Sequence, residues 1–185
     1  MEQILAEIES LVRRAEPSDT ILFSYNGHGI ERGELYLLLH RSDLDRLETT
    51  ALRWSDIEER VSRSAARVLV LLDACHAGFA TTAVAVHQDA AINRLATWSG
   101  PPIVILAASK GREKSIEIAG NGGYFTTTFA RILTEDRKRF DLNGNGFLEI
   151  SELYAGLKQE VVRISGGQQT PWIGRHGMIG DFTLF

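Results

Sequence analysis

The chain has 185 residues, 44% of them hydrophobic, and a net charge of −4, which together predict one domain with a sizeable core. Charges of both signs are scattered along it, so neither a nucleic-acid partner nor disorder is expected. No apolar run approaches the roughly 20 residues that span a bilayer, and residues 1–16 are too charged for a signal peptide. The single cysteine excludes an internal disulfide and favours a reducing compartment. We therefore expect a soluble, cytoplasmic protein without a membrane partner.

The first predicted element is an amphipathic helix over residues 3–15, where apolar residues recur at helical spacing. An apolar strand over 20–25 follows and runs into a glycine turn, Gly27-His28-Gly29. The remaining elements, in chain order, are expected to be a strand at 35–39, a helix at 56–64 capped by Ser55, strands at 67–72 and 103–107, a loop at 110–123, helices at 125–139 and 150–163, and an irregular tail from 166. Strands alternate with helices and are apolar throughout, which predicts an α/β fold with a mostly parallel sheet flanked by helices.

Two reactive residues, His28 and Cys75, each follow an apolar strand. Sites in open α/β sheets form at the carboxyl ends of strands, so we expect the two residues to face each other. An imidazole beside a cysteine can generate the thiolate nucleophile. Gly29 and Cys75 are the candidate amide donors to an oxyanion, and the glycine leaves room for a substrate carbonyl.

Other interpretations of these residues stay open at this point. A lone cysteine is more often a small buried hydrophobe than a nucleophile. His76 adjoins Cys75 and is expected to point away from it. The other histidines, His40, His87 and His176, lack glycine turns and are expected to be surface or packing residues. No cluster has the spacing of zinc ligands.

Taken together, the motifs resemble the caspase-like cysteine peptidases, especially metacaspases and bacterial caspase-domain proteins (peptidase C14-like). The segment ILFSYNGHG at 21–29 is similar to the family's strand ending in Ser-Gly-His-Gly, with Asn26 in place of Ser. VLVLLDACHAG at 68–78 is similar to the strand ending in Asp-x-Cys-His-Ser-Gly, with Ala77 in place of Ser. GGYFT at 122–126 resembles the Gly-x-Phe-Thr that opens a later helix. The resemblance covers about residues 5–185 and implies a Cys75–His28 dyad.

The resemblance also implies the domain organisation. We expect a single caspase-like domain over 1–185, with a large-subunit-like part at 1–78, a loop at 79–101 and a small-subunit-like part at 102–185. The family's N-terminal strand, helix and strand have no counterpart in this chain. The apolar edge of the 20–25 strand would then be exposed, which is an aggregation hazard. We therefore expect a missing N-terminal segment or a second chain to cover that edge.

Asp73 is the candidate substrate-binding residue. It lies two positions before Cys75, and alternate residues of a strand share a face. A carboxylate there needs a cationic partner or good hydrogen bonds, and a substrate Arg or Lys would supply the cation. The resemblance agrees, since metacaspases carry an acid at this position and cleave after basic residues. The alternative is that Asp73 only accepts backbone hydrogen bonds at the strand end.

The segment at 141–152 fits the calcium loop of an EF-hand. Its candidate metal ligands are Asp141, Asn143, Asn145, the carbonyl of Phe147, and Glu152. Asn-Gly-Asn-Gly is also ordinary turn chemistry, and this loop has no partner hand. The sequence therefore leaves Ca²⁺ as an open cofactor prediction, with weak affinity expected.

The function that the sequence favours is a cysteine endopeptidase that acts on protein or peptide substrates after Arg or Lys. Two alternatives remain: a catalytically silent caspase-like scaffold or calcium-regulated interaction module, and a hydrolase that uses the same dyad on a non-peptide substrate.

Overall fold

The computed structural model describes residues 1–76, 89–110, 113, 115–118, 122–178 and 181–184, with the backbone alone for 75, 76, 89, 90, 117 and 118. A six-stranded mixed sheet has the order β3-β2-β1-β4-β5-β8. The strands are β1 (Thr20–Glu31), β2 (Leu35–Leu37), β3 (Leu52–Arg53), β4 (Arg67–His76), β5 (Ile103–Ala107) and β8 (Trp172–His176). A separate two-stranded ribbon pairs β6 (Glu117–Ile118) with β7 (Gly122–Gly123).

The centre of the sheet is parallel, as the continuous apolar runs predict: β4 pairs in parallel with both β1 and β5. The outer strands β2, β3 and β8 pair antiparallel. β5 is buried throughout, and the described side chains of β4 are buried from Val68 onward, because helices cover both faces.

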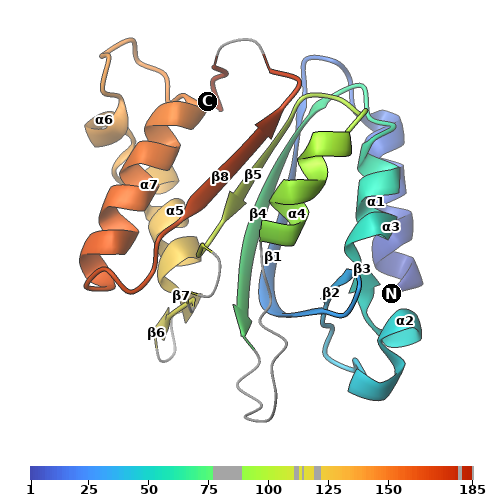
Figure 1. The fold of residues 1–185 in the computed structure, drawn as a ribbon. Coiled ribbons are helices and arrows are strands. Elements are labelled where there is room, and N and C mark those ends of the chain that lie inside the picture. Colours follow the sequence, from blue (N-terminus) through green and yellow to red (C-terminus); the bar gives the residue numbers. More distant parts are fainter. Residues whose placement is uncertain (77–88, 111–112, 114, 119–121, 179–180, 185) are drawn as a thin grey trace.

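Helices form a layer on each side of the sheet (Figure 1). One face carries α1 (Glu2–Arg14), α3 (Trp54–Val61) and α4 (Asp89–Asn93), and its core includes Ile8, Trp54, Ile57 and Val70. The other face carries α5 (Tyr124–Thr134) and α7 (Ile150–Ile164), and its core includes Leu69, Leu71, Phe125 and Leu157. Short helices complete the set: η1 (Leu44–Arg46), α2 (Leu47–Thr50), η2 (Arg94–Thr97) and α6 (Arg137–Phe140).

The expected glycine turn at Gly27-His28-Gly29 is wrong, because β1 continues through these residues to Glu31. Similarly, β4 runs past Leu72 to His76. The two strands pair along this whole stretch, and sheet pairing outweighs the local preference of the glycines for a turn. His28 and Cys75 therefore lie inside strands rather than beyond their ends.

The single helix expected over 125–139 is two helices, α5 and α6, separated at Glu135 and Asp136. The break turns Phe140 into the core, where it is 4% exposed and packs against Gly156 of α7. A Cβ at Gly156 would collide with the Phe140 ring, so the close approach requires glycine there.

Three smaller expectations also change. Ser55 lies within α3, whose N-cap is Arg53. The expected loop at 79–101 contains α4 and η2, while its residues 79–88 lie outside the described part of the chain. The expected loop at 110–123 contains the β6–β7 ribbon, and the tail supplies β8. Within the described residues, no helix is both long and apolar enough to cross a membrane.

The outer edge of β1 is open over most of its length. β2 reaches only residues 29–31, so between Thr20 and His28 the described strand partner of β1 is β4 alone. Leu22 on this strand is 50% exposed, and Leu11 of α1, expected to face the core, is 47% exposed. Both line a hollow of about 420 Å³ at the start of β1, together with Arg14, Ala15, Asp19, Thr20 and Ile21.

Candidate active site

The parallel register of β1 and β4 brings His28 and Cys75 side by side as Cα partners. Neighbouring strands lie about 4.8 Å apart, so the two backbones are adjacent although 47 residues separate them. The His28 side chain is exposed. For Cys75 the structure describes the backbone and not the thiol. The register thus supplies the backbone placement that a Cys–His pair requires.

Tyr25 holds the backbone of β1 at His28. Its hydroxyl lies 2.6 Å from the His28 carbonyl oxygen and 2.8 Å from that of Leu38, and its proton is shared between them. Burial raises the pKa of Tyr25 to about 12, so the hydroxyl keeps its proton in the neutral range. The ring crosses Gly27, where a Cβ would lie 2.6 Å from the hydroxyl oxygen. Gly27 is therefore required by the tyrosine rather than by a turn.

Gly29 is buried and has strand neighbours on both sides, His76 of β4 and Leu37 of β2. Its amide lies within the sheet, one residue beyond His28. Its role as an oxyanion donor stays a prediction, as does that of the Cys75 amide.

Asp73 is 2% exposed and accepts hydrogen bonds from two distant segments. The Ser115 hydroxyl donates to Oδ1, while the hydroxyl and N–H of Thr126 donate to Oδ2 at 2.7 and 3.3 Å. Gly123 packs against the carboxylate with no room for a Cβ. Asn26, the Cα partner of Asp73, donates its amide to the Thr126 hydroxyl at 3.3 Å. Asp73 thus joins β4 to the start of α5.

The sequence marks only one of the two residues that donate hydrogen bonds to Asp73. Thr126 ends the segment at 122–126 that stands out as a motif, whereas Ser115 lies in an expected loop with no motif around it. The register adds that Asn26 and His28 of β1 lie opposite Asp73 and Cys75 of β4. Because Asn26 and Asp73 both reach Thr126, these positions lie on the sheet face covered by α5.

The family model of the caspase domain, peptidase C14, matches residues 1–183. The chain belongs to the caspase domain family. This family is generally one of cysteine peptidases that act on protein substrates. The expected caspase-like α/β fold is confirmed.

One solved structure shows the same fold at low identity. Protein GSU0716 from Geobacter sulfurreducens matches at 17% identity with a TM-score of 0.57, over 97% of this chain and 74% of that one. Caspase-1 from Spodoptera frugiperda aligns at 11% identity with a TM-score of 0.44, over 93% of this chain and 66% of that one. No curated protein matches the chain.

In this caspase domain, the 141–152 loop is closed by its own hydrogen bonds. Asp141 accepts the N–H groups of Asn145 and Gly146 at 3.1 and 2.8 Å. Glu152, 6% exposed, accepts those of residues 142, 143 and 149, the last as part of a capping box that starts α7. The side-chain amides of Asn143 and Asn145 donate to Glu149 at 2.9 and 3.0 Å.

The oxygen-rich donor set of this loop suits Ca²⁺. Two of its members, Asp141 and Glu152, are carboxylates, and Asn143 and Asn145 supply amide oxygens. A carboxylate offers about four acceptor positions, so Asp141 and Glu152 keep positions for a cation beside the hydrogen bonds that they accept.

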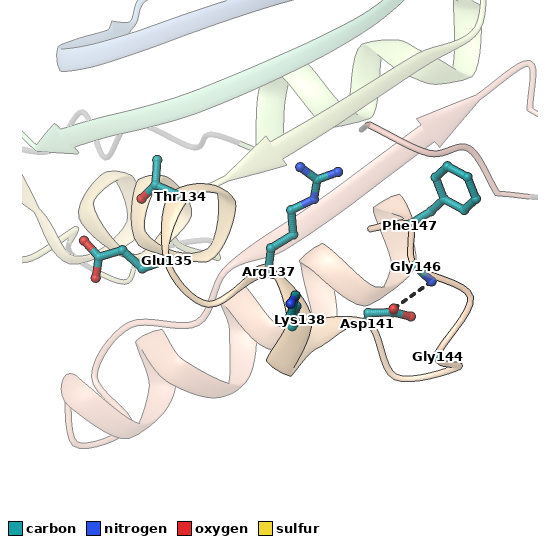
Figure 2. Close-up of a pocket in the computed structure, with 8 residues that line it drawn as sticks. All are labelled: Thr134, Glu135, Arg137, Lys138, Asp141, Gly144, Gly146 and Phe147. Carbon is teal, nitrogen blue, oxygen red and sulfur yellow. Dashed lines mark hydrogen bonds between the residues drawn. The ribbon is translucent and has the colours of Figure 1, made fainter.

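The hollow beside this loop has a volume of about 610 Å³ (Figure 2). Figure 2 shows the end of α5, the basic residues Arg137 and Lys138 of α6, and the loop residues Asp141 and Phe147 around it. Among the candidate active-site residues whose side chains are described, His28 and Asp73 do not line it.

Proposed function

We propose that this protein is a cysteine endopeptidase in which Cys75 attacks the peptide carbonyl and His28 takes up and then delivers the proton. The observation that carries the proposal is the register that makes His28 and Cys75 Cα partners on adjacent parallel strands. Alternation along β4 would direct the thiol to the face that Asp73 occupies, which is also the face of position 28. An imidazole beside a cysteine can deprotonate its thiol.

We further propose that Asp73 binds a substrate Arg or Lys before the scissile bond. Its described donors are two hydroxyls and one N–H, all neutral, and no described Lys or Arg forms an ion pair with it. A carboxylate offers about four acceptor positions, so about one is left for a substrate cation. A buried carboxylate without a cationic partner favours a cation in its neighbourhood.

The alternative for Asp73, a purely structural role, receives partial support from the same contacts, since they tie β4 to α5. A panel of fluorogenic peptides that differ only at the residue before the scissile bond separates the two roles. The proposal expects cleavage after Arg or Lys and none after Asp. Preference for Asp, or indifference to charge, would reject the binding role of Asp73 and leave the dyad untouched.

A silent scaffold and a hydrolase of non-peptide substrates are the rival functions. Reaction with a peptidyl-arginyl chloromethyl ketone distinguishes them, because a peptidase active site aligns the electrophile with its nucleophile. The peptidase proposal expects rapid alkylation at Cys75. A scaffold would react no faster with this reagent than with a simple alkylating agent, and a non-peptide hydrolase would be labelled without cleaving any peptide of the panel.

We also propose that the open edge of β1 is covered by an additional segment or a second chain. The length of β1 from Thr20 to Gly27, which has no described strand partner on its outer side, together with exposed Leu22 and the hollow that it shares with Leu11, supports this partner. An extended strand would satisfy the outward backbone groups of β1 and bury these leucines.

Because the proposed nucleophile is the only cysteine, we propose a reducing compartment such as the cytoplasm as the protein's site of action.

A further inference from the structure

Gln169 is a fully buried polar residue that the proposed mechanism does not use. It is 0% exposed. Its Oε1 accepts the N–H of Ile116 at 2.9 Å, and its Nε2 donates to the carbonyl of Ala108 at 2.9 Å. Its own N–H donates to the Ser165 hydroxyl at 3.1 Å. Both ends of the side-chain amide are thus engaged with backbone groups far away in sequence.

These two backbone groups belong to residues close to Asp73: one contacts the residue before Asp73, and the other follows the residue that donates to its carboxylate. Ala108 follows β5, and its N–H donates to the carbonyl of Leu72 at 2.8 Å, one residue before Asp73. Ile116 follows Ser115, whose hydroxyl donates to the Asp73 carboxylate. The amide of Gln169 therefore links the end of the sheet to the segment that carries Ser115.

Two further contacts hold this segment against the residues around Gln169. Glu113 accepts the N–H of Thr170 at 2.6 Å, and the Lys110 ammonium lies 4.6 Å from the centre of the Trp172 ring. Gln169 is fully buried, unlike Glu113 and Lys110, which make these two contacts. Neither Glu nor Met can replace it, because Glu has no donor for Ala108 and Met has neither a strong acceptor nor a donor. Either change leaves a buried backbone group without its partner.

We propose that Gln169 is a positioning residue that holds Ser115 against Asp73 and thereby sets the preference for a cationic side chain before the scissile bond. The inference rests on the proposed binding role of Asp73. Without Gln169, the N–H of Ile116 loses its buried acceptor, and the neighbouring Ser115 hydroxyl no longer orients Oδ1. Selectivity for the cation falls, while the dyad on β1 and β4 stays in place.

The test compares kcat/KM for two peptides that carry Arg or its neutral analogue citrulline before the scissile bond. Gln169→Met is expected to lower the Arg-to-citrulline ratio about tenfold, mainly through KM for the Arg peptide, and to change citrulline cleavage much less. Gln168→Met, on the exposed neighbour, is the matched control and keeps the wild-type ratio. An equal fall for both peptides, or an unchanged ratio, would overturn the inference and leave the proposed function standing.

A second variant keeps the inference testable if Gln169→Met does not fold. Ser115→Ala removes the hydroxyl through which Gln169 is proposed to act, and it should lower the ratio similarly, whereas Ser115→Thr retains a hydroxyl and should restore part of it. An unchanged ratio in Ser115→Ala contradicts the inference. A wild-type protein that cleaves both peptides equally, or neither, overturns the role of Asp73 as well, and that failure is visible before any variant is made.

Discussion

Thr126 donates both its hydroxyl and its backbone N–H to the carboxylate of Asp73, from 53 residues further along the chain. The contact joins β4, which carries Cys75, to the first turn of α5. It ties the C-terminal part of the chain, which contains α5, to the strand of the proposed nucleophile. The same carboxylate therefore has a structural task beside its proposed role in binding substrate.

Thr126→Val removes the hydroxyl and keeps the N–H and the branched shape. Because hydrogen bonds to a charged acceptor contribute about 1.5–3 kcal/mol, we expect the free energy of unfolding to fall by about that amount. Chemical denaturation measures it, with the exposed Thr127→Val on the same helix as the control. Equal stability of the two variants would contradict the importance of the contact.

Glu160 joins three arginines between α5, α6 and α7. Its carboxylate accepts from Arg131, Arg139 and Arg163 at 2.8–3.1 Å, and its side chain is 3% exposed. The hydrogen bond from Arg163 leads the interactions that hold the pKa of Glu160 below its ordinary value, against the opposing effect of burial. A lowered pKa stabilises the fold above the unfolded-state pKa of about 4.3, and this contribution is lost as pH falls through the folded-state pKa.

Glu160→Gln should therefore destabilise the protein at pH 7, by about 1–3 kcal/mol since the arginines are partly solvated. The difference from wild type should shrink as the pH falls below about 4. Unfolding curves across this range test it, with exposed Glu135→Gln as the control. A difference that is the same at pH 7 and pH 3 would show that charge is not the cause.

The open edge of β1 predicts self-association. Leu22→Lys places a charge on this edge and should shift the isolated protein toward monomer at equal concentration. Leu142→Lys is the control, since Leu142 is 70% exposed in the 141–152 loop, away from the edge. Sedimentation velocity gives the result, and a wild-type protein that stays monomeric at high concentration would argue against a partner at this edge.

Calcium binding to the 141–152 loop should be weak, because only Asp141 and Glu152 among the five candidate ligands are charged. Titration calorimetry should detect binding that Glu152→Gln abolishes and Glu135→Gln preserves. Absence of heat in the wild type, or the same heat in Glu152→Gln, would remove Ca²⁺ from the account.

Elements with strong apolar periodicity could be predicted closely from sequence. The strand at 103–107 has the expected bounds, and the helices α1 and α7 differ from expectation by one residue at their ends. The conformation of residues 27–29 could not be predicted from sequence. The glycines favour a turn locally, but pairing with β4 holds this stretch in an extended conformation. The break between α5 and α6 depends on where Phe140 packs, which no local pattern encodes.

Some features of the candidate site could likewise be predicted from the sequence, and others could not. The positions of His28 and Cys75 after apolar strands indicated that they would meet, and the register makes them neighbours. The partners of Asp73 could not be predicted in full, since Ser115 and Thr126 come from segments 42 and 53 residues away. The same holds for Gln169, whose contacts follow from tertiary packing alone.

The central claim, that Cys75 is a nucleophile activated by His28, is tested most directly by the rate of alkylation with a peptidyl-arginyl chloromethyl ketone, with the site mapped by mass spectrometry. We predict one adduct at Cys75, formed at least tenfold faster in the wild type than in His28→Ala, and peptide cleavage abolished in Cys75→Ala. Equal alkylation rates with and without His28, or cleavage by Cys75→Ala at the wild-type rate, would contradict the account.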